Sequence, residues 1–262
     1  MSDKTTTLEI NADGVAVITL NRPQVHNSFN TQMADELIAH AAVLRGREDV
    51  GAVVVVGAGE KAFCAGADIA EFGALSTGDH FHTFISKLSA AVEAISSLPQ
   101  PVIAAVEGIA FGGGCELALA CDFRTAAERT KFGLPEVKLG LLPGLGGTQR
   151  AIRLLPRSVA LKLLVTGDPL DAESAFNHGL CERPVAAGGA LADAMKFATA
   201  LCAGPREAIV AAKQIIDDGL ALDLPAAIAM EQEVGRRLFN TPDAREGVSA
   251  FLEKRPATFK KP

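Results

Sequence analysis

The chain contains no tryptophan and no tyrosine, and its 13 phenylalanines are the whole of its aromatic content. Two of the side chains that commonly stack on nucleobases are therefore missing. No Lys/Arg-rich block interrupts a formal net charge of −6 over 262 residues. Non-specific nucleic-acid binding depends on neutralising phosphates with clustered cations, so we predict no nucleic-acid partner.

Long apolar runs and paired cysteines are also absent. No run reaches the length of a membrane span, and the polar stretch Met1–Thr7 lacks the apolar region of a signal peptide. The cysteines form an odd set without C-x-x-C spacing, which fits neither a disulfide framework nor a zinc site. We predict a cytoplasmic protein with no membrane contact, no metal, and reduced, mostly buried thiols at Cys64, Cys115, Cys121, Cys181 and Cys202.

Apolar periodicity indicates an α/β protein followed by a helical region. Val15–Leu20 and Val53–Val56 are typical of buried strands, whereas Thr31–Arg47 and His80–Ser97 have helical spacing. From Pro205 onward the pattern is helix after helix. We predict an α/β domain over residues 1–200 and a helical oligomerisation region over residues 201–262, since such extensions often cover subunit interfaces.

The most informative stretch runs from Glu107 to Asp122. An apolar strand, Val102–Val106, precedes it, and three glycines, Gly112–Gly114, lead into a helix-permissive segment that carries Glu116. This order leaves free backbone N–H groups at a helix N-terminus, and the glycines let a ligand approach them closely. Glu116 is thus a candidate catalytic carboxylate, although a first-turn acid that complements the helix dipole is an equally simple interpretation.

A dinucleotide-binding turn is an alternative for Gly57–Ala62, which matches G-x-G-x-x-A after a strand. Such a turn leads directly into a long helix, and Phe63–Gly66 interrupts one here. A second glycine cluster, Gly140–Arg150, lacks the G-K-[ST] ending of a phosphate loop. Neither motif favours a nucleotide cofactor.

Taken in order, six segments resemble the crotonase, or enoyl-CoA hydratase, family. The resemblance implies a right-handed spiral of ββα units with a helical C-terminal region that drives trimerisation, and trimers that commonly pair into hexamers. It also implies an acyl-CoA thioester substrate, with coenzyme A as part of that substrate and no separate cofactor. The segments are Asn21–Pro23, Ala62–Ile69, Gly112–Leu117, Phe132–Glu136, Leu142–Arg150 and Glu246–Arg255.

The resemblance also implies roles for individual residues. The peptide N–H groups of Ala67 and Gly113 match the oxyanion hole, and Glu116 and Glu136 match the two catalytic glutamates of the hydratases. Gly144 matches a backbone contact to the catalytic water. The full set of implied substrate and CoA contacts is Lys61, Ala65, Asp68, Ile69 and Gly144.

Elementary chemistry agrees with these roles. Adding water across a C2–C3 double bond conjugated to a thioester builds negative charge on the thioester oxygen, which two backbone donors stabilise. Water loses a proton while C2 gains one, so one carboxyl group that acts as a general base and one that acts as a general acid are useful. We expect Glu116 to deprotonate the water and Glu136 to protonate C2, and a reversed or shared assignment stays open because coupled carboxylates titrate together.

Both glutamates favour a hydratase over an isomerase, another acyl-CoA reaction of the family, or a non-catalytic binding member. The acyl-binding walls are expected from the loop after Ile69 and from the helix over residues 80–97, and the acyl group itself stays open. Gln24 and Ala70 stand where many members have Lys. Tail lysines are candidates to replace those contacts to the CoA phosphates, namely Lys254 and Lys260.

Overall fold

The strands of the computed structural model, which describes residues 4–259, form two sheets. The first has the order β1-β2-β3-β5-β7 and the second the order β4-β6-β8-β9. Pairing is parallel except at β1 against β2 and at β9 against β8. The strands are β1 (Thr6–Ile10), β2 (Val15–Leu20), β3 (Ala52–Gly57), β4 (Ala62–Cys64), β5 (Val102–Val106), β6 (Ile109–Phe111), β7 (Phe123–Ala126), β8 (Lys131–Gly133) and β9 (Leu170–Asp171).

From β3 to β8, consecutive strands alternate between the two sheets. In each of the pairs β3/β4, β5/β6 and β7/β8, the first strand joins the larger sheet and the second joins the smaller one. Helices α2 (Ile69–Gly73) and α3 (Gly78–Ser96) follow β4, and α4 (Gly113–Ala120) follows β6. The expected α/β spiral of ββα units is therefore confirmed.

Strand β3 of the larger sheet is apolar along its whole length. Every residue of β3 is buried. Val53 and Val55 belong to the main core, while Val54 and Val56 belong to a second core under α8 (Ala190–Cys202). Both faces of β3 are therefore covered, which explains why this strand is a continuous apolar run without alternation.

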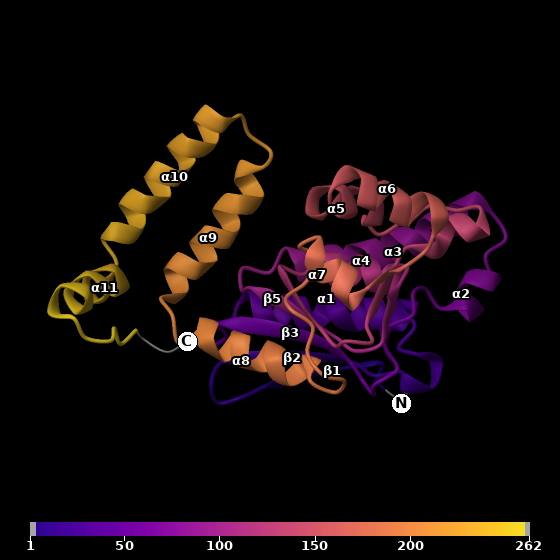
Figure 1. The fold of residues 1–262 in the computed structure, drawn as a ribbon, viewed down its shortest axis with the longest axis horizontal. Helices are drawn as coiled ribbons and strands as arrows, with labels where there is room; N and C mark the ends of the chain where they lie inside the picture. Colours follow the sequence, from indigo (N-terminus) through magenta and orange to yellow (C-terminus); the bar gives the residue numbers. More distant parts are fainter. Residues whose placement is uncertain (1–3, 260–262) are drawn as a thin grey trace.

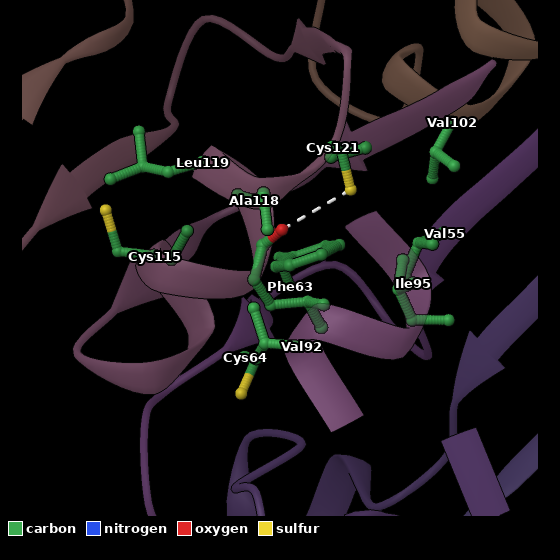
Figure 2. Close-up of a cluster of buried hydrophobic side chains, with 14 of the residues drawn as sticks. Val55, Phe63, Cys64, Val92, Ile95, Val102, Cys115, Ala118, Leu119 and Cys121 are labelled. Carbon is green, nitrogen blue, oxygen red and sulfur yellow. Dashed lines mark hydrogen bonds between the residues drawn. The ribbon is translucent and has the colours of Figure 1, made fainter. Parts of the chain in front are cut away.

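The main core lies between the two sheets and the helices that follow them. Figure 2 shows part of it, where Phe63 of β4, Val92 and Ile95 of α3, and Ala118 of α4 gather in one cluster. Cys121 closes this region, with its thiol directed at the carbonyl of Leu117. The core thus fixes α4, and with it the glycine turn, against α3 and β4.

Further helices surround this framework. Two 3₁₀ helices also belong to the body: η1 (Pro23–Val25) follows β2, and η2 (Pro135–Leu139) follows β8. The predicted helix from Thr31 ends early because Gly46 caps it. The remaining helices of the body are α1 (Thr31–Arg45), α5 (Gly147–Leu154), α6 (Arg157–Thr166) and α7 (Ala172–Asn177).

Three C-terminal helices form an arm that reaches away from the sheets (Figure 1): α9 (Arg206–Gly219), α10 (Leu224–Phe239) and α11 (Pro242–Glu253). The predicted boundary after residue 200 falls inside α8, and the arm begins after Pro205. Lys213 of α9 anchors the arm through a 2.7 Å ion pair with Asp122.

The arm buries little of its own apolar surface. Ala211 and Ala250 are its buried apolar residues among those described, and α10 has none. Its exposed large hydrophobic residues are Ile216, Leu220, Leu222, Leu224, Ile228, Phe239, Val248, Phe251 and Leu252. The described part of the arm therefore has little apolar core of its own.

Two predictions about smaller features have clear outcomes. The Gly57–Ala62 motif leads into strand β4 rather than a helix, so the dinucleotide-binding alternative is wrong. All five cysteines are buried and unpaired, as predicted. Within residues 4–259, none of the helices combines the length and apolarity that a membrane crossing requires.

Candidate active site

A cavity of about 610 Å³ opens beside the N-terminus of α4. Glu116 and Glu136 both line it, and its other walls are predominantly apolar. The expected walls are present in α2 and α3. The segment before α5 adds a wall that sequence reasoning missed; the large apolar lining residues are Val25, Ile69, Phe72, Phe81, Ile85, Leu88, Leu139, Leu141, Leu142 and Leu145.

The two peptide N–H groups of the expected oxyanion hole lie close together. A Cβ placed on Gly113 would be 3.8 Å from the nitrogen of Ala67, and one on Gly66 would be 3.7 Å from the nitrogen of Gly113. Gly113 begins α4, where a backbone N–H has no acceptor within the helix. Within residues 4–259 neither N–H has a hydrogen-bond acceptor. Both donors line the cavity, so they can bind an oxygen there.

Glu116 lies in the first turn of α4 with only 1% of its surface exposed. Its Oε1 accepts hydrogen bonds from the N–H groups of Leu145 and Gly147, each at 2.7 Å. Burial, together with the charge of Glu136, raises the pKa of Glu116 to about 7, although the two N–H donors and the charge of Arg150 lower it. The carboxyl group is therefore poised to exchange a proton near neutral pH.

Glu136 lies in the first turn of η2 and is half-buried. Burial raises the pKa of its carboxyl group. Its Oε2 is buried, and the described part of the chain offers it no hydrogen-bond partner. A Cβ on Gly112 would be 3.2 Å from Oε1 of Glu136, so this carboxyl group lies against the peptide that precedes Gly113.

Four of the five expected substrate contacts line the cavity. Ala65, Ile69 and Gly144 do so with no polar side chain to offer, and Gly144 packs so tightly on α3 that a Cβ would approach Ile85 to 2.7 Å. Asp68 also lines the cavity, but its carboxylate is engaged elsewhere. Lys61 is exposed on the loop between β3 and β4 and is not part of the lining, so its contact with CoA stays a prediction.

The carboxylate of Asp68 has a structural role in this chain. It forms a 2.7 Å ion pair with Arg22 and accepts a 2.9 Å hydrogen bond from the N–H of Ala70, which caps α2. The pKa of Asp68 is lowered, since the Arg22 guanidinium and the Ala70 N–H outweigh its burial. Asp68 therefore fixes the entry of α2 beside Ala67.

The replacement of the missing CoA contacts by tail lysines stays a prediction. Lys254 follows α11 at the far end of the arm, opposite α2, and it does not line the cavity (Figure 1). Lys260 lies outside the described residues. At the two departures, Gln24 is exposed and not part of the lining, whereas Ala70 lines the cavity. Residues 4–259 hold no cluster of three or more His, Cys, Asp or Glu side chains suited to a metal ion.

The family model described as enoyl-CoA hydratase/isomerase matches residues 10–262. The chain belongs to this family. It is 40% identical to a Rhizobium meliloti protein named "Probable enoyl-CoA hydratase", over 97% of this chain and 98% of the relative. It is 38% identical to the Clostridium acetobutylicum protein named "Short-chain-enoyl-CoA hydratase", over 92% of each chain.

Solved structures agree with this membership. The crystal structure of an enoyl-CoA hydratase from Bacillus anthracis superposes with a TM-score of 0.94 at 37% identity, covering 98% of this chain and 99% of the other. The crotonase fold expected from the sequence is confirmed at this level of similarity.

The hydrogen bonds from Leu145 and Gly147 to Glu116 are the main site feature that sequence reasoning missed. They join positions 29 and 31 residues apart. The glycine cluster over residues 140–150 was recognised, but only as a poor phosphate loop and a family motif. Its spacing does not reveal which anion its N–H groups would bind.

Proposed function

We propose that this family member is an enoyl-CoA hydratase, which adds water across the C2–C3 double bond of a 2-enoyl-CoA to give a 3-hydroxyacyl-CoA. One observation carries the proposal: two carboxyl groups with raised pKa values line the same cavity as two peptide N–H groups that have no acceptor within residues 4–259. The names of the relatives support the same reaction class.

The peptide N–H groups of Ala67 and Gly113 are proposed to bind the thioester carbonyl. As water adds at C3, electron density moves through C2 to this oxygen, and both donors strengthen their hydrogen bonds with it. Removing one such donor in other enzymes costs about 3–4 kcal/mol of transition-state stabilisation. Gly113 adds the positive end of the α4 dipole to this effect.

The two glutamates are proposed to divide the proton transfers. Glu116 keeps Oε1 fixed by two N–H donors, which favour the carboxylate, so it takes the proton from the attacking water. Glu136 has a buried, unpartnered oxygen, which favours the neutral acid, so it delivers a proton to C2. The pKa of Glu116 is nevertheless raised to about 7, in part by the charge of Glu136. The two carboxyl groups therefore form a coupled pair that shares protons.

The wider setting of the reaction is proposed from the family and from the surface. Coenzyme A enters as part of the substrate and no other cofactor is required. The apolar walls suit a hydrocarbon acyl group. The exposed hydrophobic residues of the arm suit an interface in a trimer or a hexamer of paired trimers, in a cytoplasmic enzyme of fatty-acid or related acyl-CoA metabolism.

Product analysis in labelled water tests the reaction itself. Purified protein is mixed with crotonyl-CoA in oxygen-18-labelled water, and the CoA products are separated and weighed by mass spectrometry. A hydratase yields 3-hydroxybutyryl-CoA that carries one heavy oxygen at C3. No labelled product, together with conversion of a 3-enoyl-CoA into its 2-enoyl isomer, would replace hydration by isomerisation.

A further inference from the structure

We infer that Arg150 is a positioning residue for Glu116: it clamps the turn whose two N–H groups hold the Glu116 carboxylate. This inference deepens the proposed function and rests on it for its kinetic consequences. Arg150 does not line the cavity and makes no contact with a bound substrate in the proposed geometry. Its influence would pass through the backbone of the turn.

The guanidinium of Arg150 contacts the turn directly. Its Nη1 donates a 2.8 Å hydrogen bond to the carbonyl oxygen of Leu145. The N–H of that same residue, and that of Gly147, donate to Oε1 of Glu116 at 2.7 Å. Leu145 is thus held at both of its backbone polar groups: its carbonyl oxygen accepts from Arg150, and its N–H donates to Glu116.

Gly146 lets the guanidinium reach this position. Its φ of 99° lies in the left-handed region, and a Cβ there would come within clashing distance of Nη1 of Arg150. Glycine at this position therefore permits both the left-handed backbone of the turn and the close approach of Arg150. Any larger residue would separate the guanidinium from the carbonyl of Leu145.

A second contact ties Arg150 to a wall of the cavity. Its Nη2 forms a 3.0 Å ion pair with Glu93 of α3, the helix that also carries Ile85 and Leu88. Arg150 therefore bridges α3, α5 and the turn. Rotation of the turn would break the bond to Leu145, so the bridge limits how far the N–H donors of Glu116 can move.

The charged and titratable groups around Glu116 come from several elements. Glu136 of η2 raises the pKa of Glu116, whereas the positive charge of Arg150 on α5 lowers it. The neighbouring Cys115 has a thiol whose pKa is itself raised by burial, so it stays neutral. Removing Arg150 takes away one positive charge and loosens two hydrogen bonds, and both changes disfavour the carboxylate.

The test compares Arg150→Met and Arg150→Lys with Arg153→Met. Arg153 is the matched control because it lies on the same helix, is exposed, and donates hydrogen bonds to Gln149 within α5. Rates of crotonyl-CoA hydration are measured from about pH 5 to about pH 9, and acetyl-CoA affinity is measured by calorimetry. The carboxyl group of Glu116 is titrated by carbon-13 NMR, with Glu116→Gln used to assign its signal.

We expect Arg150→Met to lower kcat by about 10- to 100-fold, as for other small misplacements of a catalytic group, with acetyl-CoA affinity unchanged. The acid limb of kcat/KM and the NMR titration should both move to higher pH. Arg150→Lys should recover part of kcat, because an ammonium can donate to the carbonyl of Leu145. Arg153→Met should match wild type in every readout.

An unchanged NMR titration in folded Arg150→Met would overturn the inference, as would a loss of kcat without movement of the acid limb. Wild-type protein that fails to hydrate crotonyl-CoA would instead overturn the proposed function. The NMR comparison would still decide the role of Arg150 in that event, because it needs no turnover.

Discussion

At the scale of single residues, Glu116 is held in a compromise between burial and hydrogen bonding. A carboxylate removed from water loses solvation, and two N–H donors restore only part of it. The pKa of about 7 records that balance, against an ordinary value of 4.5. The folded protein therefore retains a proton on Glu116 at pH values where the unfolded chain has already released it.

This difference predicts a pH dependence of stability. A raised pKa stabilises the fold below about 4.5, and the contribution is lost as the pH rises through about 7. Glu116→Gln should remove the loss. At pH 8 we expect the free energy of unfolding of Glu116→Gln to exceed that of wild type by up to about 3 kcal/mol. Near pH 4.5 the free energies of unfolding of the two proteins should be equal.

Urea unfolding at the two pH values measures the effect, with Glu48→Gln as an exposed control in the turn after α1. An equal stability difference at both pH values would show that solvation of Glu116 is not its cause.

The sequence points to the candidate site residues but not to the contacts that hold them in place. Glu116 and Gly113 stand out because strand, glycine turn and helix start follow one another directly in the chain. Glu136 and Ala67 depended on the family resemblance. The bonds from Leu145 and Gly147 depend on tertiary folding and have no local pattern.

At the scale of elements, the turn before α5 is shaped around Glu116. A Cβ on Gly147 would lie 2.9 Å from Cγ and 3.0 Å from Oε1 of Glu116. It would also lie 2.9 Å from Cβ of Pro143, so the turn has no free side to move toward. Glycine at this position permits the short hydrogen bond.

Gly147→Ala should therefore damage the site more than the fold. We expect a loss of about 1–3 kcal/mol in unfolding free energy from overpacking and a fall in kcat of about 100-fold from displacement of Glu116. Denaturant unfolding and the hydration assay measure both. Gly46→Ala is the control: no atom stands within 4 Å of a Cβ there, φ is −91°, and we expect no loss of activity. Normal kcat in Gly147→Ala would contradict the account of the turn.

Helices were predicted well where caps or breakers mark their ends. Thr241 caps α11 and Asp171 caps α7, and both residue types favour this position in a sequence. The end of the helix from Thr31 was placed too late, because the apolar spacing continues past its glycine cap at Gly46. Helix α8 was not predicted, and its buried face consists mainly of alanines, which give a weak periodic pattern.

At the scale of the whole molecule, the arm is the part whose apolar side chains a single chain leaves largely exposed. Ile216 of α9 and Leu220, which caps its end, lie in the region predicted to be helical, yet these apolar side chains are 62% and 77% exposed. Periodicity reports that a face is apolar and does not report what covers it. The sequence could therefore predict the helices of the arm, while its direction depends on packing that the pattern does not encode.

Phe251→Asp tests whether the arm carries the interface. Phe251 is 82% exposed in the single chain, and a charge there should be costly only where another copy buries it. By light scattering we expect wild type at a multiple of three copies and the variant at a lower mass, approaching the 27.2 kDa single chain. Val43→Asp, on the exposed side of α1, should keep the wild-type mass. A wild-type monomer would contradict the proposed assembly.

The central claim is that Glu116 and Glu136 together hydrate an enoyl thioester. Its most direct test is the initial rate at which the conjugated enoyl-thioester absorbance of crotonyl-CoA disappears, for wild type, Glu116→Gln and Glu136→Gln side by side. We predict rapid loss in wild type and a fall of about 100-fold or more in each variant, with circular dichroism unchanged, since each Gln removes one proton-transfer group. A near-normal rate in either variant would contradict the claim.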